Sequence, residues 1–188
     1  MPSSVTRPVT RKYWGWTKTP PVWYNQVGGL LKTEKRLLLR DANDSDLPLL
    51  LAWRNNPLIW EGTYTQRDPL LWEDHVTWWK KKLSNHRSFM VLFVNETEIR
   101  PVGVLHISPL DYWSPEIGII IGEVSLWDTG VGTEAFRLGC EWLKEQGYKW
   151  TSTTVLKSNK RAIRMLEKLN FKYTCEARKG ELRYAKAL

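Results

Sequence analysis

The sequence predicts a mixed α/β fold, and three observations support this prediction. Strand-like and helix-like segments follow one another in the order β-α-α-β-β-β-α-β-α-β-β. The helix-like segments repeat their apolar residues with the period of an α-helix, whereas the strand-like segments are short and rich in β-branched residues. No internal repeat or linker divides the 188 residues, which are enough for one domain with a hydrophobic core. We therefore expect a sheet with helices packed against it.

The first part of this order is a strand followed by two helices. Residues 37–40 are a short apolar strand pattern. Ser45-Asp46 can cap a helix that continues through Trp53, and Asn55-Asn56-Pro57 should end it. Asp68-Pro69 then predicts the start of a second helix, because proline is favoured in a first helical turn.

Four strand patterns follow in the middle of the chain. Residues 89–94 and 102–107 predict two strands joined by a polar turn. Residues 117–121 are apolar at every position except one glycine, which predicts a central strand buried on both faces. A further strand pattern covers residues 150–156.

Two helices and a final hairpin complete the order. A helical pattern begins at Thr133, and Gly147 is a plausible stop. Ser158 is expected to cap the second helix. Residues 171–177 and 182–187 predict a hairpin around Lys179-Gly180.

The bulk properties narrow the partners and the compartment. The net charge of +8 and the isoelectric point of about 9.5 favour an anionic partner, such as nucleic acid or a phosphorylated small molecule. No apolar run is long enough to span a membrane, and the N-terminus lacks the apolar core of a signal peptide. Cys140 and Cys175 have no metal-ligand spacing, so we expect two buried thiols and a cytoplasmic protein without a metal.

The N-terminal segment is predicted to be an ordered arm. Residues 1–33 carry five aromatic residues between positions 13 and 24, whereas disordered tails are poor in aromatics. We expect this arm to pack against the domain of residues 34–188 or against a partner subunit. A homodimer is left open.

The segment that carries chemistry is the glycine-rich turn before the helix at Thr133. Gly130 and Gly132 follow the central strand by way of Trp127-Asp128-Thr129. Such a turn exposes unpaired N–H groups at the positive end of the helix dipole, which suits a diphosphate. By itself a Gly-x-Gly turn is also compatible with a purely structural role. The motifs of P-loops and of dinucleotide-binding folds are absent.

Three segments, in the right order, resemble the GNAT superfamily of N-acyltransferases over residues from about 36 to 188. Residues 116–122 resemble the fourth strand of the family, residues 127–135 its pyrophosphate loop, and residues 158–171 its Asn-x-x-Ala-Ile helix. The resemblance implies a central, mostly antiparallel sheet with splayed fourth and fifth strands and with helices on both faces. It also implies acetyl-CoA as co-substrate and no metal.

The resemblance further implies where the cofactor binds. The pantetheine arm would pair with the backbone of the fourth strand, and the Ile120 N–H would polarise the thioester carbonyl. The implied cofactor-binding residues are Ile119, Ile120, Ile121, Trp127, Asp128, Thr129, Gly130, Val131, Gly132, Thr133, Asn159 and Arg161.

Three positions depart from the family pattern. Trp127 stands where the loop usually has Arg or Gln, and Leu166 stands where many members have a tyrosine acid. Asn170 replaces a glycine, which is a mild change because asparagine also tolerates left-handed φ values.

The acceptor side carries a second resemblance. Trp53-Arg54-Asn55 is similar to a signature of two GNAT branches, one acetylating α-amines such as ribosomal-protein N-termini and the other acetylating amino groups of sugar nucleotides. We expect Trp53 to pack in the core. Arg54 and Asn55, with Glu61 and Tyr64, are expected to bind the acceptor.

A carboxylate is expected to remove the proton of the acceptor ammonium. Glu116 begins the fourth strand and is expected to lie at the edge of a dry cleft. The alternative, favoured equally by the sequence, is that Glu116 is a surface glutamate at a strand end. Glu61 and Asp111 are reserve candidates, whereas His75 and His106 are expected to be structural.

Three functions remain open on the sequence alone. The favoured one is acetylation of a small-molecule or peptide amine. The second is acetylation of an RNA-bound substrate or a ribosomal protein, which the basic composition suggests. The third is a non-catalytic module that binds CoA or nucleic acid on this fold.

Overall fold

The computed structural model describes residues 36–62, 66, 68–82, 85–95 and 98–188. The predicted N-terminal arm and Tyr64 lie outside these residues and stay predictions. The strands are β1 (Arg36–Asp41), β2 (Arg87–Val94), β3 (Ile99–Ser108), β4 (Glu116–Ile121), β5 (Trp150–Leu156), β6 (Lys172–Arg178) and β7 (Glu181–Ala187). The helices are α1 (Leu47–Arg54), α2 (Pro57–Trp60), α3 (Trp72–Lys82), α4 (Val131–Glu145) and α5 (Lys160–Lys168), with single 3-10 turns η2 (Asp44–Asp46) and η3 (Val124–Leu126).

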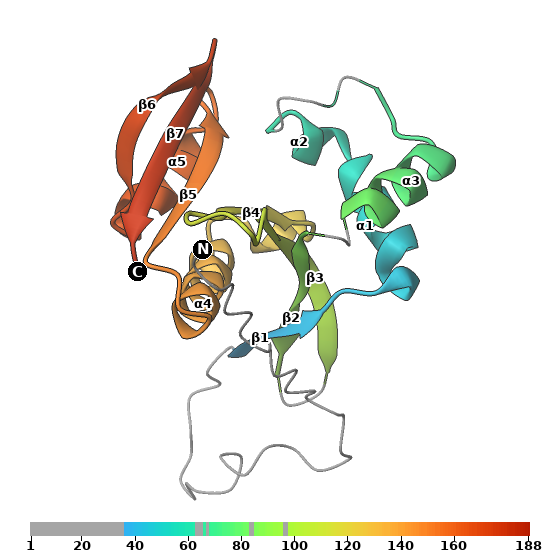
Figure 1. Ribbon diagram of the computed structural model, residues 1–188. Helices are drawn as coiled ribbons and strands as arrows, with labels where there is room; N and C mark the ends of the chain where they lie inside the picture. Colours follow the sequence, from blue (N-terminus) through green and yellow to red (C-terminus); the bar gives the residue numbers. More distant parts are fainter. Residues whose placement is uncertain (1–35, 63–65, 67, 83–84, 96–97) are drawn as a thin grey trace, which may run out of the picture. The chain divides into compact units, whose positions relative to one another are not determined.

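All these strands form one sheet in the order β1-β2-β3-β4-β5-β7-β6, and each neighbouring pair is antiparallel except β4 and β5. Glu116 and Ser152 are the one residue pair that joins the parallel strands β4 and β5. In contrast, β5 pairs with β7 along its whole length. The sheet therefore opens after Glu116, which confirms the predicted splay between the fourth and fifth strands (Figure 1).

Helices cover both faces of the sheet, as predicted. Successive side chains of a strand point to opposite faces. In β2, Phe89 and Val91 therefore pack in the core that α4 covers, whereas Met90 and Leu92 pack in a second core with α1 and α3. Figure 1 shows α4 and the pair α1 and α3 on different sides of β2–β4.

The region after α1 contains a short helix that the sequence analysis did not predict. Asn55-Asn56-Pro57 does end α1, but it also begins α2. The Asn56 side chain accepts a hydrogen bond from the Leu58 N–H, and Pro57 occupies the first helical position. The helix predicted from Asp68-Pro69 begins later, at Trp72.

Other local predictions had mixed outcomes. Gly147 follows the end of α4 with φ of 91°, and Asn170 has φ of 64°, so both adopt the expected left-handed conformation. Asn159, not Ser158, caps α5, because its side chain accepts a hydrogen bond from the Ala162 N–H. The expectation for the thiols was half wrong: Cys140 is buried, whereas Cys175 is exposed because β6 is the outer strand of the sheet.

None of the helices in the described residues has the length and apolar character needed to cross a membrane.

Candidate active site

Two cavities meet at the gap between β4 and β5. The first, the hairpin cavity, has a volume of about 620 Å³ and is lined by residues that include Glu116, Gly118, Thr154, Glu181 and Arg183. The second, the loop cavity, has a volume of about 760 Å³ and is lined by residues that include Trp127, Gly130, Gly132, Thr133 and Arg161. Ile119, Asn159 and Met165 line both cavities, so the two spaces adjoin across the gap.

The first turn of α4 presents unpaired N–H groups beside the loop cavity. Gly130 precedes the helix with φ of 92° and has no side chain that could cap it. The Glu134 N–H donates to the Gly130 carbonyl at 3.0 Å. The N–H groups of residues 131–133 have no acceptor among the described residues. The uncapped turn therefore offers several donors and the positive end of a helix dipole to an anion.

A guanidinium group lies next to the same turn. The Arg161 Nε is 3.1 Å from an oxygen of Asp128, and the Arg161 guanidinium carbon lies 4.3 Å from the centre of the Trp127 ring. The Trp127 indole N–H donates to the Ile121 carbonyl at 2.9 Å. These contacts join the N-terminus of α5, the glycine-rich loop and the end of β4 around one cavity.

The register of β4 decides which backbone groups face the gap. The Gly122 N–H donates to the Val102 carbonyl of the neighbouring strand at 2.9 Å. In an antiparallel pair, the direction of the backbone groups alternates along the strand. The N–H and carbonyl of Ile120 therefore face β3, and those of Ile119 and Ile121 face the gap. The predicted donor, the Ile120 N–H, points away from the gap.

Asn159 and Gly62 lie against each other where the two cavities adjoin. A Cβ on Gly62 would lie 3.2 Å from the Asn159 side-chain nitrogen. The Asn159 side-chain oxygen caps α5, which leaves its NH₂ group as a donor. The segment after α2 and the start of α5 thus approach each other at the gap.

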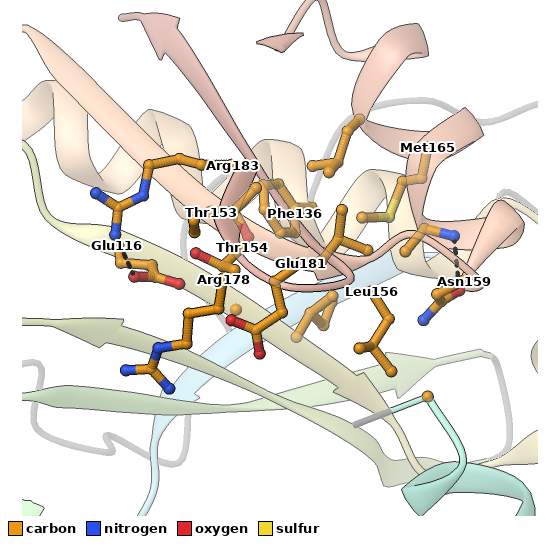
Figure 2. A pocket seen from close by; sticks show the side chains of 17 residues that line it. Glu116, Phe136, Thr153, Thr154, Leu156, Asn159, Met165, Arg178, Glu181 and Arg183 are labelled. Atoms are coloured by element: carbon orange, nitrogen blue, oxygen red, sulfur yellow. Dashed lines mark hydrogen bonds and ion pairs between the residues drawn. The ribbon is translucent and has the colours of Figure 1, made fainter. Parts of the chain in front are cut away.

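The hairpin cavity carries charges of both signs, as Figure 2 shows. Glu116 lies 3.9 Å from Arg183, and its side chain is 41% exposed, so the dry cleft expected around Glu116 is not found. Glu181, from the start of β7, is buried and lines the same cavity.

A cluster of basic and aromatic side chains lies beneath the Ile120 side chain. The Arg54 guanidinium carbon is 4.4 Å from the centre of the Trp78 ring, and the His75 ring stacks on Trp78 at 5.7 Å. Burial, together with the Arg54 charge, lowers the pKa of His75, and burial also lowers the pKa of the Arg54 guanidinium. His75 is thus held as a neutral, packed ring, in agreement with the expected structural role.

Asn55 contacts the backbone of Leu70, just before α3. Its side chain donates to the Leu70 carbonyl at 3.0 Å and accepts from the Leu70 N–H at 2.8 Å. Gln66 donates to the Arg54 carbonyl at 2.8 Å. The expected acceptor-binding residue Asn55 is therefore engaged in backbone contacts with Leu70.

Comparison with known proteins now decides the family. The family model of the acetyltransferase (GNAT) domain matches residues 36–172. The chain belongs to this family. The predicted GNAT fold and the predicted membership of an acetyltransferase family are thereby confirmed, whereas the branch within the family is not settled.

Individual relatives support the same family. Uncharacterized protein MJ1062 of Methanocaldococcus jannaschii is 40% identical over 151 residues, which are 80% of this chain and 31% of that protein. The chain thus spans about a third of that relative's length. A domain from M. jannaschii has a crystal structure that matches with a TM-score of 0.80 and 39% identity, over 82% of this chain and 100% of that one. Spermidine N-acetyltransferase from Vibrio cholerae, solved with CoA and spermine, matches in fold with a TM-score of 0.71 and 16% identity, over 80% and 95% of the two chains.

Most of the GNAT cofactor positions expected from the sequence lie together around the loop cavity. Those that line it are Ile119, Ile120, Ile121, Trp127, Asp128, Gly130, Gly132, Thr133, Asn159 and Arg161. Val131 is buried and packs its side chain in the core, and the Thr129 hydroxyl donates to the Leu126 carbonyl. These two residues belong to the GNAT loop without lining the cavity.

The reserve carboxylates of the GNAT site lie elsewhere. Glu61 lines the loop cavity and not the hairpin cavity. Asp111 accepts a hydrogen bond from Asn85 at 2.6 Å and lines neither cavity. Leu166, at the position of the usual tyrosine acid, is buried.

Sequence reasoning missed the residues that β7 and β4 add to the site. Glu181 and Arg183 line the hairpin cavity and lie outside the segments that resemble GNAT motifs, whereas Gly118 lies within the fourth-strand segment but was not singled out. One signal was available: Leu182 and Tyr184 face the core, so Glu181 and Arg183 must point to the other face.

Proposed function

We propose that this chain is an acetyl-CoA-dependent N-acetyltransferase that acetylates a primary amine by direct attack on the thioester. The observation that carries this proposal is the gap after Glu116, which adjoins two cavities of different character. The loop cavity offers uncapped N–H groups and a guanidinium, which suit the cofactor. The hairpin cavity offers carboxylates, which suit an ammonium.

The residues around the loop cavity fit the parts of acetyl-CoA. The N–H groups of residues 131–133, with Arg161, would hold the diphosphate through charge-assisted hydrogen bonds. The gap-facing backbone groups of Ile119 and Ile121 would pair with the pantetheine arm as a neighbouring strand does. The Asn159 NH₂ group would donate to it from the other side. The CoA complex of the V. cholerae relative supports the choice of cofactor.

The donor to the thioester carbonyl is better assigned to a neighbour of Ile120. Because the Ile120 N–H faces β3, the N–H groups available in the gap are those of Ile119 and Ile121. The Ile121 carbonyl accepts from Trp127, but its N–H stays directed toward the gap. An N–H group fixed in this direction would stabilise negative charge on the carbonyl oxygen.

Glu116 is the proposed base. It takes a proton from the acceptor ammonium, directly or through a water, and the freed amine attacks the thioester carbon. A C–N bond forms, the C–S bond breaks and CoA leaves as a thiolate, while the second nitrogen proton passes to water or to the thiolate. Since Leu166 replaces the tyrosine acid, this route uses no acid at that position.

We propose that the acceptor is a protein α-amine or an amino sugar nucleotide. These are the acceptors of the two GNAT branches whose signature Trp53-Arg54-Asn55 resembles. The half-buried Arg54 beside Trp78 places a positive charge under this end of the site, which would suit an acceptor that also carries a negative group. Small amines without a negative group, such as putrescine, serve as comparison substrates.

The test is turnover of acetyl-CoA with three amines: a tripeptide with a free α-amine, UDP-glucosamine and putrescine. Mass spectrometry should detect one added acetyl group on at least one amine, with CoA released in equal amount. A chemical thiol assay needs a Cys175→Ser background, because the exposed Cys175 thiol would react. Binding of acetyl-CoA without turnover of any amine would favour a non-catalytic module, and salt-sensitive binding of tRNA would favour an RNA-bound acceptor.

Gly132→Val provides the matched binding test. A Cβ at Gly132 would be 3.5 Å from Ile121, an ordinary contact, whereas Gly130 has a left-handed φ that a side chain would strain. Gly132→Val should fold normally and lose most affinity for acetyl-CoA, because its branched side chain would enter the diphosphate position. Unchanged affinity in this variant would rule out the proposed cofactor site.

A further inference from the structure

Each glutamate that lines the hairpin cavity has an arginine near it. Glu116 lies 3.9 Å from Arg183, and Arg178 stands opposite Glu181 in the register of β6 and β7. These four residues all line the cavity. Figure 2 shows the four side chains around this space, with Arg183 directed at Glu116. An acceptor bound here would therefore meet positive as well as negative groups of the protein.

The proposed base and one of these arginines project from the same face of the sheet. Leu182 packs in the core on the α4 side, so Glu181 and Arg183, which flank it in β7, point to the opposite face. Ile117 packs in that same core, which puts Glu116 of β4 on the opposite face as well. A ligand that reaches Glu116 from this face therefore also reaches Arg183.

The contact between Arg183 and Glu116 is a loose one. Its 3.9 Å exceeds the length of an N–H···O hydrogen bond, which is about 2.7–3.2 Å. Arg40 and Arg87, in comparison, hydrogen-bond to aspartates at 2.6 Å. In the described part of the chain, the guanidinium of Arg183 donates no hydrogen bond, and its side chain is 47% exposed. Its N–H groups are thus available to a ligand.

Binding of an ammonium group at Glu116 would alter the charge balance of this pair. The ammonium would bring a second positive charge close to the Arg183 guanidinium, and like charges at such a distance repel each other. A negative group on the same acceptor would offset this repulsion and accept paired hydrogen bonds from the guanidinium. A second ammonium on the acceptor would add to the repulsion. The cavity therefore favours an amine that also carries an anion over a diamine.

We propose that Arg183 binds a negative group of the acceptor, a carboxylate or a phosphate, while Glu116 takes the proton from its amine. This inference rests on the proposed function and narrows the acceptor to an amine with an anionic group on the same molecule. Arg183 forms and breaks no covalent bond in this scheme. Its role is separate from that of Arg54, which lines neither cavity.

The test uses two pairs of amines in which one member carries the negative group and the other does not. Glucosamine 1-phosphate with methyl glucosaminide tests a phosphate, and triglycine with triglycine amide tests a carboxylate. UDP-glucosamine and putrescine complete the series. Wild type should favour the anionic member of at least one pair by about tenfold or more in kcat/KM. Both members of a pair present the same amine to Glu116, so an effect on the base cancels in this ratio.

The variants are Arg183→Gln and Arg183→Lys, at a side chain exposed enough for both to fold, which thermal unfolding checks. Arg183→Gln should bring the ratio to about one, and Arg183→Lys should fall in between, since it keeps the charge without the planar fork. If UDP-glucosamine alone is acetylated, its KM replaces the ratio and should rise about tenfold in Arg183→Gln. Affinity for acetyl-CoA should not change. Lys172→Gln, which removes an exposed cation of β6 that lines neither cavity, should match wild type.

Three results would overturn the inference. Equal use of both members of each pair by wild type, or a preference for putrescine, would show that the site selects no negative group. An unchanged ratio, or an unchanged KM for UDP-glucosamine, in both Arg183 variants would assign the anion to another residue. An equal effect of Lys172→Gln would mean that only the overall charge matters. If wild type binds no acetyl-CoA or acetylates none of these amines, the proposed function fails together with this inference, which is distinct from the other outcomes.

Discussion

The Arg161 guanidinium lies over the Trp127 indole, with 4.3 Å between the guanidinium carbon and the ring centre. Trp127 occupies the position at which GNAT loops usually carry Arg or Gln. In this chain the positive charge beside the loop comes from α5, since Arg161 also lies 3.1 Å from Asp128. The stacking of Arg161 on Trp127 thus offers a physical explanation for the missing loop cation.

The first prediction is that Arg161→Ala weakens binding of acetyl-CoA about tenfold, because a charge-assisted contact to phosphate is lost. Arg161→Lys should fall in between, since it keeps the charge but not the planar stacking. Calorimetric titration measures both variants. Lys157→Ala, which removes an exposed cation that lines neither cavity, is the control. An equal loss in Lys157→Ala would mean that Arg161 acts only through the overall charge.

The second prediction concerns the proposed base. Glu116→Gln keeps the shape of the side chain but cannot take a proton, so kcat should fall about 10²-fold at neutral pH. Affinity for acetyl-CoA should be nearly unchanged. The loss should shrink at higher pH, where the amine deprotonates without help. Steady-state kinetics over a pH series tests this, and a variant with the wild-type rate at neutral pH would exclude Glu116 as the base.

The third prediction compares Gly118, which lies in β4, with Gly122, the residue that follows β4. A Cβ on Gly118 would meet nothing within 4 Å, whereas a Cβ on Gly122 would lie 2.1 Å from the Trp53 ring. Gly122→Ala should therefore destabilise the protein by about 1–3 kcal/mol, as overpacked cores do. Gly118→Ala should leave the thermal midpoint nearly unchanged.

Gly118→Val extends this comparison to function. Its side chain would enter the hairpin cavity, so the KM for the amine should rise while binding of acetyl-CoA is retained. Thermal unfolding and steady-state kinetics give the two readouts. If Gly118→Ala and Gly122→Ala lose the same stability, the free space next to Gly118 is not as described.

The fourth prediction is a loss of stability in mild acid that depends on His75. Burial and the Arg54 charge lower the pKa of His75 in the folded protein below its usual value of about 6.5. The unfolded chain therefore binds the proton first as the pH falls. The His75 contribution is fully present above about pH 6.5 and decreases as the pH falls toward the folded pKa.

Urea unfolding at a series of pH values tests this prediction. The free energy of unfolding of wild type should fall between about pH 7 and about pH 5, and His75→Gln should show a smaller fall. Equal slopes for the two proteins would mean that His75 does not titrate as described.

The sequence predicted those parts of the site that depend on local signals. The turn at Gly130 and the helix after it are encoded within a few residues, and so is the cap of α5, apart from a shift of one residue from Ser158 to Asn159. The Asn56-Pro57 pair misled the prediction, because the same residues that end α1 also begin α2.

What the sequence could not predict depends on register between strands. The direction of the Ile120 N–H follows from its pairing with β3, which no local motif encodes. Glu181 reaches the site because β7, the last strand of the chain, pairs with β5 next to the gap. Pairing between strands that are distant in sequence is a tertiary property.

The central claim is that acetyl-CoA binds in the gap between β4 and β5, and residue-resolved amide exchange tests it most directly. In the free protein, the gap-facing amides of Ile119 and Ile121 should exchange faster than the amide of Ile120, which donates to β3. Saturation with acetyl-CoA should slow exchange at Ile119, at Ile121 and in residues 131–133, with little change at Ile120. Slowing at Ile120 alone, or none at these positions under saturation, would contradict the account.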